Sequence, residues 1–269
     1  MKIGICGLGI VGSAVYNFFK DKEVELYIYD KYKYNGIPNY IDTLMESEIL
    51  YICLPTLYDE ILKSYNMEAI NNTIDILNNM KYTGIIIIKS TVLPDYIDTL
   101  NCIYKDLNII YNPEFLSAKT ASYDFANQHH IILGYTIQSK PVISLVEHFY
   151  KMYFPNTLIS ITTAKEASIT KLACNSFYAV KVQFFTEIYL LCQNNNINYD
   201  NIKKMMLMNG WIHNMHCNIP GPDNNISYGG MCLPKDIMAF NEYLINYEIP
   251  NGVIDSTIIE RNSMRNSKD

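Results

Sequence analysis

A glycine-rich turn between a short apolar run and a helical pattern constrains the fold of this chain more than any other feature. The sequence reads KIGIC over residues 2–6 and continues GLGIVG, which places glycines at positions 7, 9 and 12. A short apolar run is typical of a buried parallel strand, and residues 10–20 carry Val and Phe side chains on one helical face. A strand, this glycine spacing and a helix predict the start of a dinucleotide-binding fold.

Each glycine of the turn has a separate physical task. Gly7 permits the tight turn, Gly9 lets the backbone approach a pyrophosphate, and Gly12 lets the helix pack closely on the strand. The helix opens at Ile10 and Val11, where free N–H groups and the helix dipole favour an anion. The sequence therefore predicts a pyrophosphate site at these five residues.

An acidic residue closes the next apolar run. VELYIYD spans residues 24–30, and Asp30 lies 18 residues after Gly12. A carboxylate there accepts a hydrogen bond from a ribose 2′-hydroxyl and repels a 2′-phosphate, which favours NAD over NADP. The alternative is a turn that serves packing alone, followed by an acid that stands there by chance.

Further segments alternate in the same way. Residues 59–80 have a helical pattern, and apolar runs typical of strands occupy residues 48–55, 84–91, 107–115 and 130–135. Strands that alternate with helices predict a parallel, doubly wound sheet. Residues 1–158 are therefore expected to form an α/β, Rossmann-type NAD-binding domain.

Polar residues lie where these strands should end. Ligands of such sheets bind outside the carboxyl ends of the strands. Ser90 and Thr91 either lie near the reactive end of the cofactor or simply cap a helix or turn. The residues at the expected strand ends are Pro55, Thr56, Ser90, Thr91, Asn112 and Glu114.

The second half of the chain changes to a helical pattern. More than thirty residues pass without Gly or Pro, and Thr162 or Thr163 is a suitable N-cap with Glu166 three or four residues later. A helix over residues 163–193 is longer than most, so it is expected to run through the centre of a helical domain or across a dimer interface. We therefore expect residues 159–269 to form an all-helical central domain and the chain to form homodimers.

Two polar side chains share one face of this helix. Lys171 and Asn175 are four residues apart, so they lie one above the other. A lysine and an asparagine that point together into a cleft can bind an oxyanion. The alternative is a surface lysine with a polar neighbour.

The stretch SYGGMCLPKD, residues 227–236, places Cys232 shortly after two glycines. Glycines allow a ligand or another backbone to come close, and Lys235 and Asp236 follow within four residues. This setting is either that of a reactive thiol beside charged groups or that of an unreactive loop cysteine.

The other cysteines and the net charge exclude several classes of protein. The seven cysteines form no C-x-x-C pair, so neither disulfides nor a zinc site is expected, and free thiols favour the cytoplasm. His213, His216 and Cys217 lack a fourth ligand at helical spacing, so no metal is expected. A net charge of −6 argues against a nucleic-acid partner. We expect neither a signal peptide nor a membrane span, because no apolar run approaches about 18 residues.

Several stretches together resemble the UDP-glucose/GDP-mannose dehydrogenase family. NPEFL and GG-x-C-x-P-K-D are its specific signals, whereas G-x-G-x-x-G is not, and the resemblance covers nearly the whole chain. It implies oxidation of the C6 alcohol of a nucleotide sugar to a carboxylate with two NAD. After the glycine-rich start, the matching stretches are CLPT (53–56), KSTV (89–92), NPEFL (112–116), KLACNSFYAVKVQFFTEI (171–188) and GGMCLPKD (229–236).

The resemblance implies a catalytic role for each matching residue. Cys232 would attack an aldehyde to give a thiohemiacetal, which becomes a thioester when the second hydride leaves. Lys171 and Asn175 would stabilise the oxyanion. Asp236 would orient water or the lysine, and Glu114 would assist proton transfer during hydrolysis of the thioester.

The same resemblance extends to the cofactor and the sugar. Thr91 would lie beside the nicotinamide. A cation near Cys232, supplied by Lys171, would favour the thiolate. The residues expected to contact the sugar are Phe115, Leu116, Lys171, Asn175, Tyr228 and Gly229.

The sequence also departs from the family pattern. Family members are longer and continue into a second Rossmann-like domain that holds the nucleotide, whereas this sequence ends at ERNSMRNSKD. Ala118 and Ser168 stand where acidic residues are common, and Trp211 stands near the place of an arginine. The resemblance thus implies a short form, in which the substrate is smaller or bound differently, another chain supplies the missing domain, or activity is lost.

Two other functions stay open at this point. A β-hydroxyacid dehydrogenase also joins a Rossmann domain to a helical domain and uses a Lys-x-x-x-Asn pair, but it needs no catalytic cysteine. A non-catalytic NAD-binding partner protein is the third alternative. Substitution of Cys232 separates the two enzymes, and turnover on sugar nucleotides separates both from the partner protein.

Overall fold

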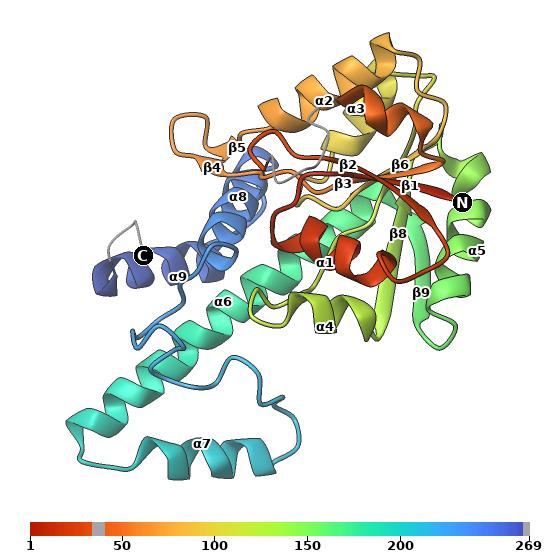
Figure 1. Cartoon of the computed structure of the whole chain (residues 1–269). Helices are drawn as coiled ribbons and strands as arrows, with labels where there is room; N and C mark the ends of the chain where they lie inside the picture. The colour runs from red at the N-terminus through yellow and green to blue at the C-terminus, as the bar shows by residue number, and fades with distance from the viewer. Residues whose placement is uncertain (34–40, 266–269) are drawn as a thin grey trace. The chain divides into compact units, whose positions relative to one another are not determined.

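The chain forms two compact units in the computed structural model (Figure 1), which describes residues 1–33 and 41–265. The first unit contains residues 1–57 and 65–171, and the second contains residues 58–64 and those from 172 onward. The sequence pattern predicts the boundary between the two domains at residue 158 instead. In the structure the next strand, β9 (Leu158–Thr163), belongs to the sheet of the first unit.

The first unit is built on a seven-stranded sheet. Its spatial order is β2-β1-β3-β6-β7-β8-β9, and every pair is parallel except β7 with β8. The predicted α/β fold class is therefore confirmed, but one pair of neighbouring strands is antiparallel. Before β9, the strands in chain order are β1 (Lys2–Cys6), β2 (Glu25–Tyr29), β3 (Ile49–Ile52), β6 (Ile85–Ile88), β7 (Asn108–Tyr111) and β8 (His130–Tyr135).

The reversal of β8 differs from the parallel arrangement that the alternating pattern predicts. The helix between the two strands, α4 (Ala121–Ala126), has 6 residues, which at 1.5 Å per residue makes it about 9 Å long. Tyr111, the last residue of β7, pairs with Gly134 near the end of β8, so the two strands approach this pairing from opposite directions.

The strand order changes direction between β1 and β3. From β1 the chain moves outward to β2, and β3 then lies on the other side of β1. Such a switch point leaves a crevice at the carboxyl ends of the two central strands. Gly7 follows β1 and Cys53 follows β3, so the glycine-rich turn lies at the switch point.

Alternate side chains of each strand face opposite sides of the sheet. In β1, Ile3 and Ile5 pack into one core and Cys6 packs into the other. Figure 1 shows helices on both sides of the sheet. The first core is covered by α1 (Ile10–Phe19), α4 and α5 (Ile143–Tyr153). The short turn η2 (Lys140–Val142) precedes α5. The second core is covered by η1 (Ile41–Glu46), α2 (Glu68–Asn79) and α3 (Tyr96–Ile103).

The helix predicted over residues 59–80 begins later than expected. A two-stranded hairpin comes first, formed by β4 (Tyr58–Asp59) and β5 (Ser64–Tyr65). The Asp59 carboxylate accepts the N–H groups of Ile61 and Leu62, each at 2.9 Å. An aspartate that bonds to the backbone two residues later stabilises a turn in place of a helix, so α2 starts only after the hairpin.

The second unit consists mainly of helices. Phe185 of α6 packs with Tyr199 of α7, and Ala179 of α6 packs with Ile237 of α8. The predicted helix over residues 163–193 matches α6 to within one residue at each end. The helices are α6 (Ala164–Asn194, which enters this unit at residue 172), α7 (Tyr199–Met208), α8 (Leu233–Asn246) and α9 (Gly252–Met264).

The N-terminus of α6 has the predicted capping box. The N–H of Glu166 donates to Thr163 Oγ1 at 3.2 Å, and the N–H of Thr163 donates to Glu166 Oε2 at 3.0 Å. Hydrogen bonds from the Thr162 hydroxyl and from Thr163 lower the pKa of Glu166 to about 2. The helix start is thus fixed by side chains that the sequence already indicates.

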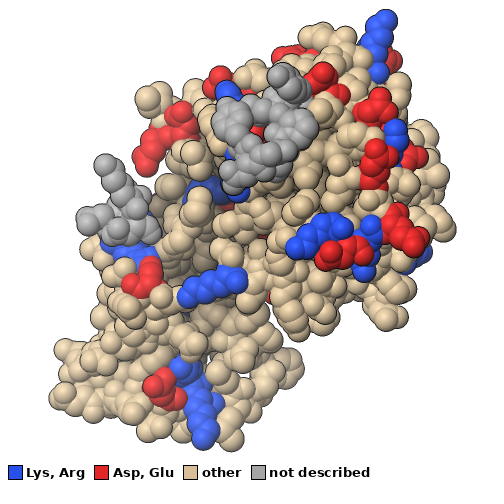
Figure 2. All heavy atoms as spheres, in the orientation of Figure 1, with Lys and Arg blue, Asp and Glu red and all other residues tan. Residues whose placement is uncertain are grey.

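Charged side chains of both signs are interspersed on the face that Figure 2 shows. No helix within residues 1–33 and 41–265 combines the length and the apolar character that a membrane span needs.

Candidate functional site

The glycine-rich turn has the geometry that a dinucleotide requires. Gly7 has φ +92°, and a Cβ at Gly12 would lie 1.8 Å from the carbonyl oxygen of Gly7. Gly9 is the N-cap of α1, where a Cβ would meet nothing within 4 Å and no side chain caps the helix. The N-terminus of α1, which opens with Ile10 and Val11, therefore fits a pyrophosphate, because its N–H groups are available as donors.

The carboxylate of Asp30 is fixed by backbone donors. Its Oδ2 accepts the N–H of Leu8 at 2.6 Å, and its Oδ1 accepts the N–H groups of Tyr32 and Lys33 at 2.9 and 3.0 Å. A carboxylate has about four lone-pair positions, so a ribose hydroxyl can still donate to it. The ammonium of Lys33 donates to the carbonyl oxygen of Leu8.

We expect NAD to bind at least about tenfold more tightly than NADP, because a 2′-phosphate would meet the Asp30 carboxylate at short range. Titration of the protein with each cofactor measures the ratio. Equal affinities, or tighter binding of NADP, would show that Asp30 does not contact the ribose.

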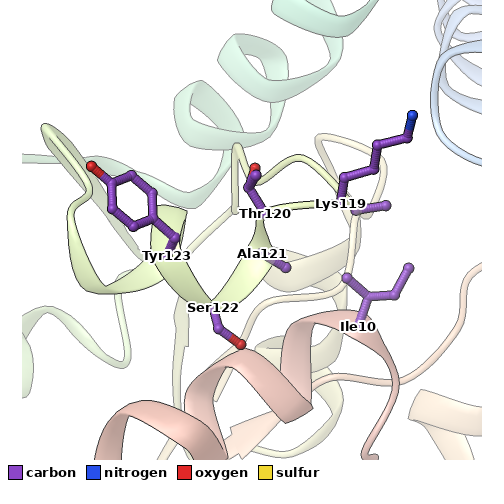
Figure 3. Close-up of a pocket in the computed structure, with 7 residues that line it drawn as sticks. Ile10, Lys119, Thr120, Ala121, Ser122 and Tyr123 are labelled. Atoms are coloured by element: carbon purple, nitrogen blue, oxygen red, sulfur yellow. The ribbon is translucent and has the colours of Figure 1, made fainter. Parts of the chain in front are cut away.

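A hollow of about 410 Å³ lies beside the N-terminus of α1 (Figure 3). It is lined by Ile10 and by residues 118–123, which lead into α4. The side-chain amide of Asn17 in α1 donates to Ser122 Oγ at 3.2 Å, which ties these segments together. The first turn of α1 therefore faces open space on this side.

The loops after β3 and β6 are joined by a buried hydroxyl. Ser90 Oγ donates to the carbonyl oxygen of Leu54 at 2.7 Å. Pro55 is exposed, whereas Thr56 and Thr91 are buried. Ser90 and Thr91 lie outside α3 and its N-cap, so neither caps that helix, and Ser90 holds the loop of β3 in place.

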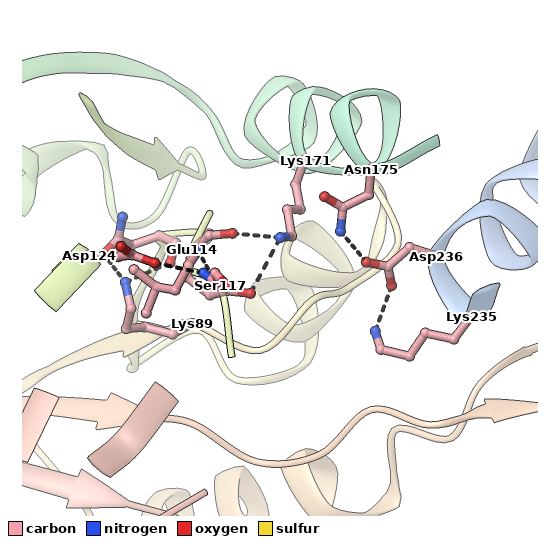
Figure 4. A network of polar contacts seen from close by, with 10 residues as sticks. Lys89, Glu114, Ser117, Asp124, Lys171, Asn175, Lys235 and Asp236 are labelled. Atoms are coloured by element: carbon pink, nitrogen blue, oxygen red, sulfur yellow. Dashed lines mark hydrogen bonds and ion pairs between the residues drawn. The ribbon is translucent and has the colours of Figure 1, made fainter. Parts of the chain in front are cut away.

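Lys171 reaches the NPEFL segment within the first unit (Figure 4). Its ammonium donates to the carbonyl oxygen of Glu114 at 2.6 Å and lies 3.3 Å from Glu114 Oε1. It also lies 5.1 Å from the centre of the Phe115 ring. Glu114 Oε2 accepts the N–H of Leu116 at 2.7 Å. Four residues that the sequence singled out therefore lie together, with the cation only 4% exposed.

Asn175 and Asp236 meet within the second unit. The amide of Asn175 donates to Asp236 Oδ2 at 2.6 Å, and the ammonium of Lys235 donates to Asp236 Oδ1 at 2.5 Å (Figure 4). The side chain of Asp236 is 1% exposed, and these two donors stabilise it inside the unit. This carboxylate therefore fixes the amide of Asn175.

Cys232 is the N-cap residue of α8, and its side chain is exposed. Its carbonyl oxygen accepts the N–H of Asp236 at 3.0 Å, which starts the helix, and a proline stands in the first turn. Positive charge at a helix N-terminus favours a thiolate. The structure thus gives Cys232 access to solvent at the N-terminus of a helix.

Tyr228 and Gly229 pack inside the second unit. The Tyr228 ring is 2% exposed and lies under the guanidinium of Arg261, 5.7 Å from its centre. A Cβ at Gly229 would lie 1.7 Å from Nη1 of Arg265. The side chain of Tyr228 therefore belongs to the core, and any contact of this segment with a sugar comes from its backbone.

The predicted catalytic residues thus fall into two groups, one in each unit. Thr91, Glu114 and Lys171 belong to the first unit, whereas the second holds Asn175, Cys232 and Asp236. Sequence reasoning missed Lys235 as the partner of Asp236. Neighbours in a helix do not usually face each other, so no periodic signal indicated that ion pair.

The histidines of the second unit have structural partners. The ring of His216 stacks on Tyr178, with centres 4.6 Å apart, and His213 Nδ1 accepts the N–H of Met215. Burial lowers the pKa of His216 below its usual value. In the described part of the chain, no three His, Cys, Asp or Glu side chains are grouped so that they could hold a metal ion.

A sheet with a glycine-rich turn at its switch point, joined to a helical unit, defines the class of α/β proteins that bind dinucleotides. Residues 30–154 match the NAD binding domain of the UDP-glucose/GDP-mannose dehydrogenase family, and residues 165–263 match the central domain of the same family. The chain belongs to this family, as the sequence motifs predicted, and its first domain binds NAD.

A curated relative is the UDP-glucose 6-dehydrogenase of Campylobacter jejuni. It is 31% identical over 251 residues, which cover 91% of this chain and 61% of the relative. The chain therefore spans about three fifths of the length of that enzyme.

Two solved structures share the fold. The UDP-D-ManNAc dehydrogenase of Pyrococcus horikoshii has a TM-score of 0.83 at 19% identity. The matched region covers 98% of this chain and 69% of that structure. The 3-hydroxyisobutyrate dehydrogenase of Mycobacterium tuberculosis has a TM-score of 0.73 at 13% identity. The matched region covers 96% of this chain and 91% of that structure. At these identities the likeness establishes the fold alone.

Proposed function

We propose that this protein oxidises the C6 alcohol of a sugar or nucleotide sugar to a carboxylate, with NAD as the hydride acceptor. The observation that carries the proposal is the setting of Cys232, an exposed thiol at the N-terminus of α8. One turn later on the same helix, Asp236 is buried and bonded to Asn175 and Lys235. An enzyme that stops at a carbonyl compound needs no nucleophile of this kind.

The covalent steps use the Cys232 sulfur. NAD, when bound, supplies the chemistry of accepting a hydride. The thiolate adds to the aldehyde carbon, and Lys171 and Asn175 donate hydrogen bonds to the oxygen that gains negative charge. After this carbon loses its second hydride, Cys232 holds the acid as a thioester. Water then adds to the carbonyl carbon, the C–S bond breaks, and the thiolate and a carboxylate are released.

Two carboxylates serve these steps in different ways. Asp236 accepts hydrogen bonds from Asn175 and Lys235, so it orients the amide that donates to the oxyanion. Glu114 lies 3.3 Å from the Lys171 ammonium, where it assists proton transfer when water attacks the thioester. Phe115 and Leu116 follow Glu114 and are proposed to contact the sugar, together with the backbone of Gly229.

A substrate screen tests the proposal. The protein is incubated with NAD and a panel of UDP-sugars, GDP-sugars and free sugars, and NADH and acid are both quantified. We expect two NADH per molecule of acid, because an alcohol loses four electrons on its way to a carboxylate.

The stoichiometry also separates the alternatives. One NADH per molecule and a carbonyl product would indicate a two-electron dehydrogenase of the β-hydroxyacid type. NAD binding without turnover on any member of the panel would indicate a non-catalytic partner protein.

We further propose that the second unit forms a homodimer through α6 and α7. Phe177, Phe184 and Leu191 recur every seven residues on α6, so they lie on one helical face, and each is at least 48% exposed. Most of the side chains on this part of the unit are uncharged in Figure 2. The exposed apolar residues of α6, α7 and the following loop include Phe177, Phe184, Leu191, Met205, Met208 and Trp211.

We expect light scattering to give twice the chain mass of 31.0 kDa at micromolar concentration. Phe184→Glu with Leu191→Glu should produce a monomer, because the two carboxylates would be buried without partners at the interface. Ile103→Glu, at an exposed position of the first unit, is the matched control and should remain dimeric. A monomeric wild-type protein would contradict the proposal.

A further inference from the structure

A buried lysine without a part in the steps above lies at the end of β6. Lys89 is 2% exposed. Its ammonium donates to Asn112 Oδ1 at 2.7 Å and lies 3.3 Å from the Asn112 carbonyl oxygen. It also lies 5.6 Å from the centre of the Phe125 ring. The two hydrogen bonds of Lys89 thus both go to Asn112, the first residue of the NPEFL segment.

Asn112 is bonded through each of its polar groups. Its N–H donates to the carbonyl oxygen of Ile88 at 2.9 Å. Its side-chain amide donates to the carbonyl oxygen of Ile132 at 2.8 Å. Its Oδ1 accepts the Tyr150 hydroxyl at 2.6 Å in addition to Lys89. Asn112 is therefore a fixed point between β6, β8 and α5.

The position of the Lys171 ammonium depends on the position of Asn112. Asn112 is followed by Pro113, whose ring fixes one backbone dihedral, and then by Glu114. The carbonyl oxygen of Glu114 is the acceptor that Lys171 reaches at 2.6 Å. A shift of Asn112 would therefore move the acceptor of Lys171.

Burial lowers the pKa of Lys89 to about 8, while Cys53 and Glu114 raise it and Lys171 lowers it. An apolar side chain of similar length would avoid this cost, but it could not donate hydrogen bonds to Asn112. The unfolded chain holds the Lys89 proton more tightly than the folded one. This group therefore makes the free energy of unfolding rise with pH between about 8 and 10.5.

We propose that Lys89 is a positioning residue, which holds the Lys171 ammonium in place through Asn112, Pro113 and Glu114. The proposal rests on the proposed function in one respect, namely that Lys171 stabilises the oxyanion. The position of Lys171 itself can be measured without turnover.

The first experiment observes the lysine ammonium groups by NMR in protein with ¹⁵N-labelled lysine. Lys171→Arg assigns the Lys171 signal. In Lys89→Met we expect this signal to shift or broaden, because its acceptor moves. Lys105→Met, an exposed lysine of the same unit, is the matched control and should leave the signal unchanged. An unchanged Lys171 signal in folded Lys89→Met would overturn the proposal.

A second variant keeps the test decisive if Lys89→Met does not fold. Tyr150→Phe removes one hydrogen bond to Asn112 Oδ1 and leaves the lysine in place. It should move the Lys171 signal in the same direction. Lys89→Gln, which keeps an N–H donor, should restore the signal in part, whereas a role in packing alone would make Gln no better than Met.

Kinetics provide the second readout. Lys89→Met should lower the rate of acid formation about tenfold, a change of ~1.4 kcal/mol, with little change in NAD affinity. In a Lys171→Met background the same substitution should cost less than about twofold, because its effect passes through Lys171. Independent, multiplying effects would contradict the proposal. Absence of turnover in the wild type would refute the proposed function, while the NMR result would still decide the role of Lys89.

Discussion

Gly12→Ala is expected to abolish useful NAD binding and to destabilise the first unit. A Cβ at this position would lie 1.8 Å from the carbonyl oxygen of Gly7 and 2.9 Å from its carbon. Both atoms belong to the backbone of the turn, so no flexible side chain can move away. α1 must therefore shift from the turn, and we expect the Kd for NAD to rise at least about 100-fold, or ~2.8 kcal/mol.

Titration with NAD and thermal unfolding measure the two effects. Gly9→Ala is the matched control, because its Cβ would meet nothing within 4 Å. It should leave the unfolding temperature near that of the wild type and weaken NAD binding only through contact with the pyrophosphate. Wild-type NAD affinity in Gly12→Ala would contradict the assignment of the turn.

The sequence predicts this turn well because the constraint is local. A strand, three glycines and a helix all lie within residues 2–20. The two cores follow from the alternation of side chains along each strand. The same holds for α6, whose start at Thr163 and Glu166 is set by neighbours in sequence. Elements that depend on local chemistry are therefore placed to within a residue or two.

Two features of the fold depend on information that a helical or apolar pattern lacks. Residues 59–67 are periodic enough for a helix, but the Asp59 side chain bonds to the backbone of Ile61 and Leu62 and forms a turn. The direction of β8 depends on the path of the chain after β7. Hydrophobic periodicity reports which face of a segment is buried and says nothing about the direction of a strand.

The candidate site shows the same division. The sequence motifs single out Asn175 and Asp236, which the structure joins across 61 positions at 2.6 Å. Lys89 was not singled out. It lies in KSTV beside Ser90 and Thr91, but its hydrogen-bond partner is Asn112, 23 positions later. Contacts of this kind come from the packing of the sheet, which no local pattern encodes.

Cys232 is expected to be the most reactive of the seven cysteines. Burial raises the pKa of Cys6 and of Cys53 to about 12, so both should stay inert at neutral pH. Cys102 is exposed as Cys232 is, but it lies within α3 and not at a helix N-terminus. Mild iodoacetamide followed by mass spectrometry of the peptides should therefore find Cys232 alkylated first, and Cys102 serves as the internal comparison.

Cys232→Ser should separate the two oxidation steps. Transfer of the first hydride from an alcohol needs no thiol, so the variant should still form NADH in a first turnover. Without the sulfur no thioester forms, and we expect the release of acid to fall on the order of 10³-fold. Cys102→Ser is the control and should retain both steps. If the folded Cys232→Ser variant releases acid at the wild-type rate, or if Cys102 is alkylated faster than Cys232, then Cys232 is not the nucleophile, and oxidation to the acid must proceed without a covalent intermediate on this helix.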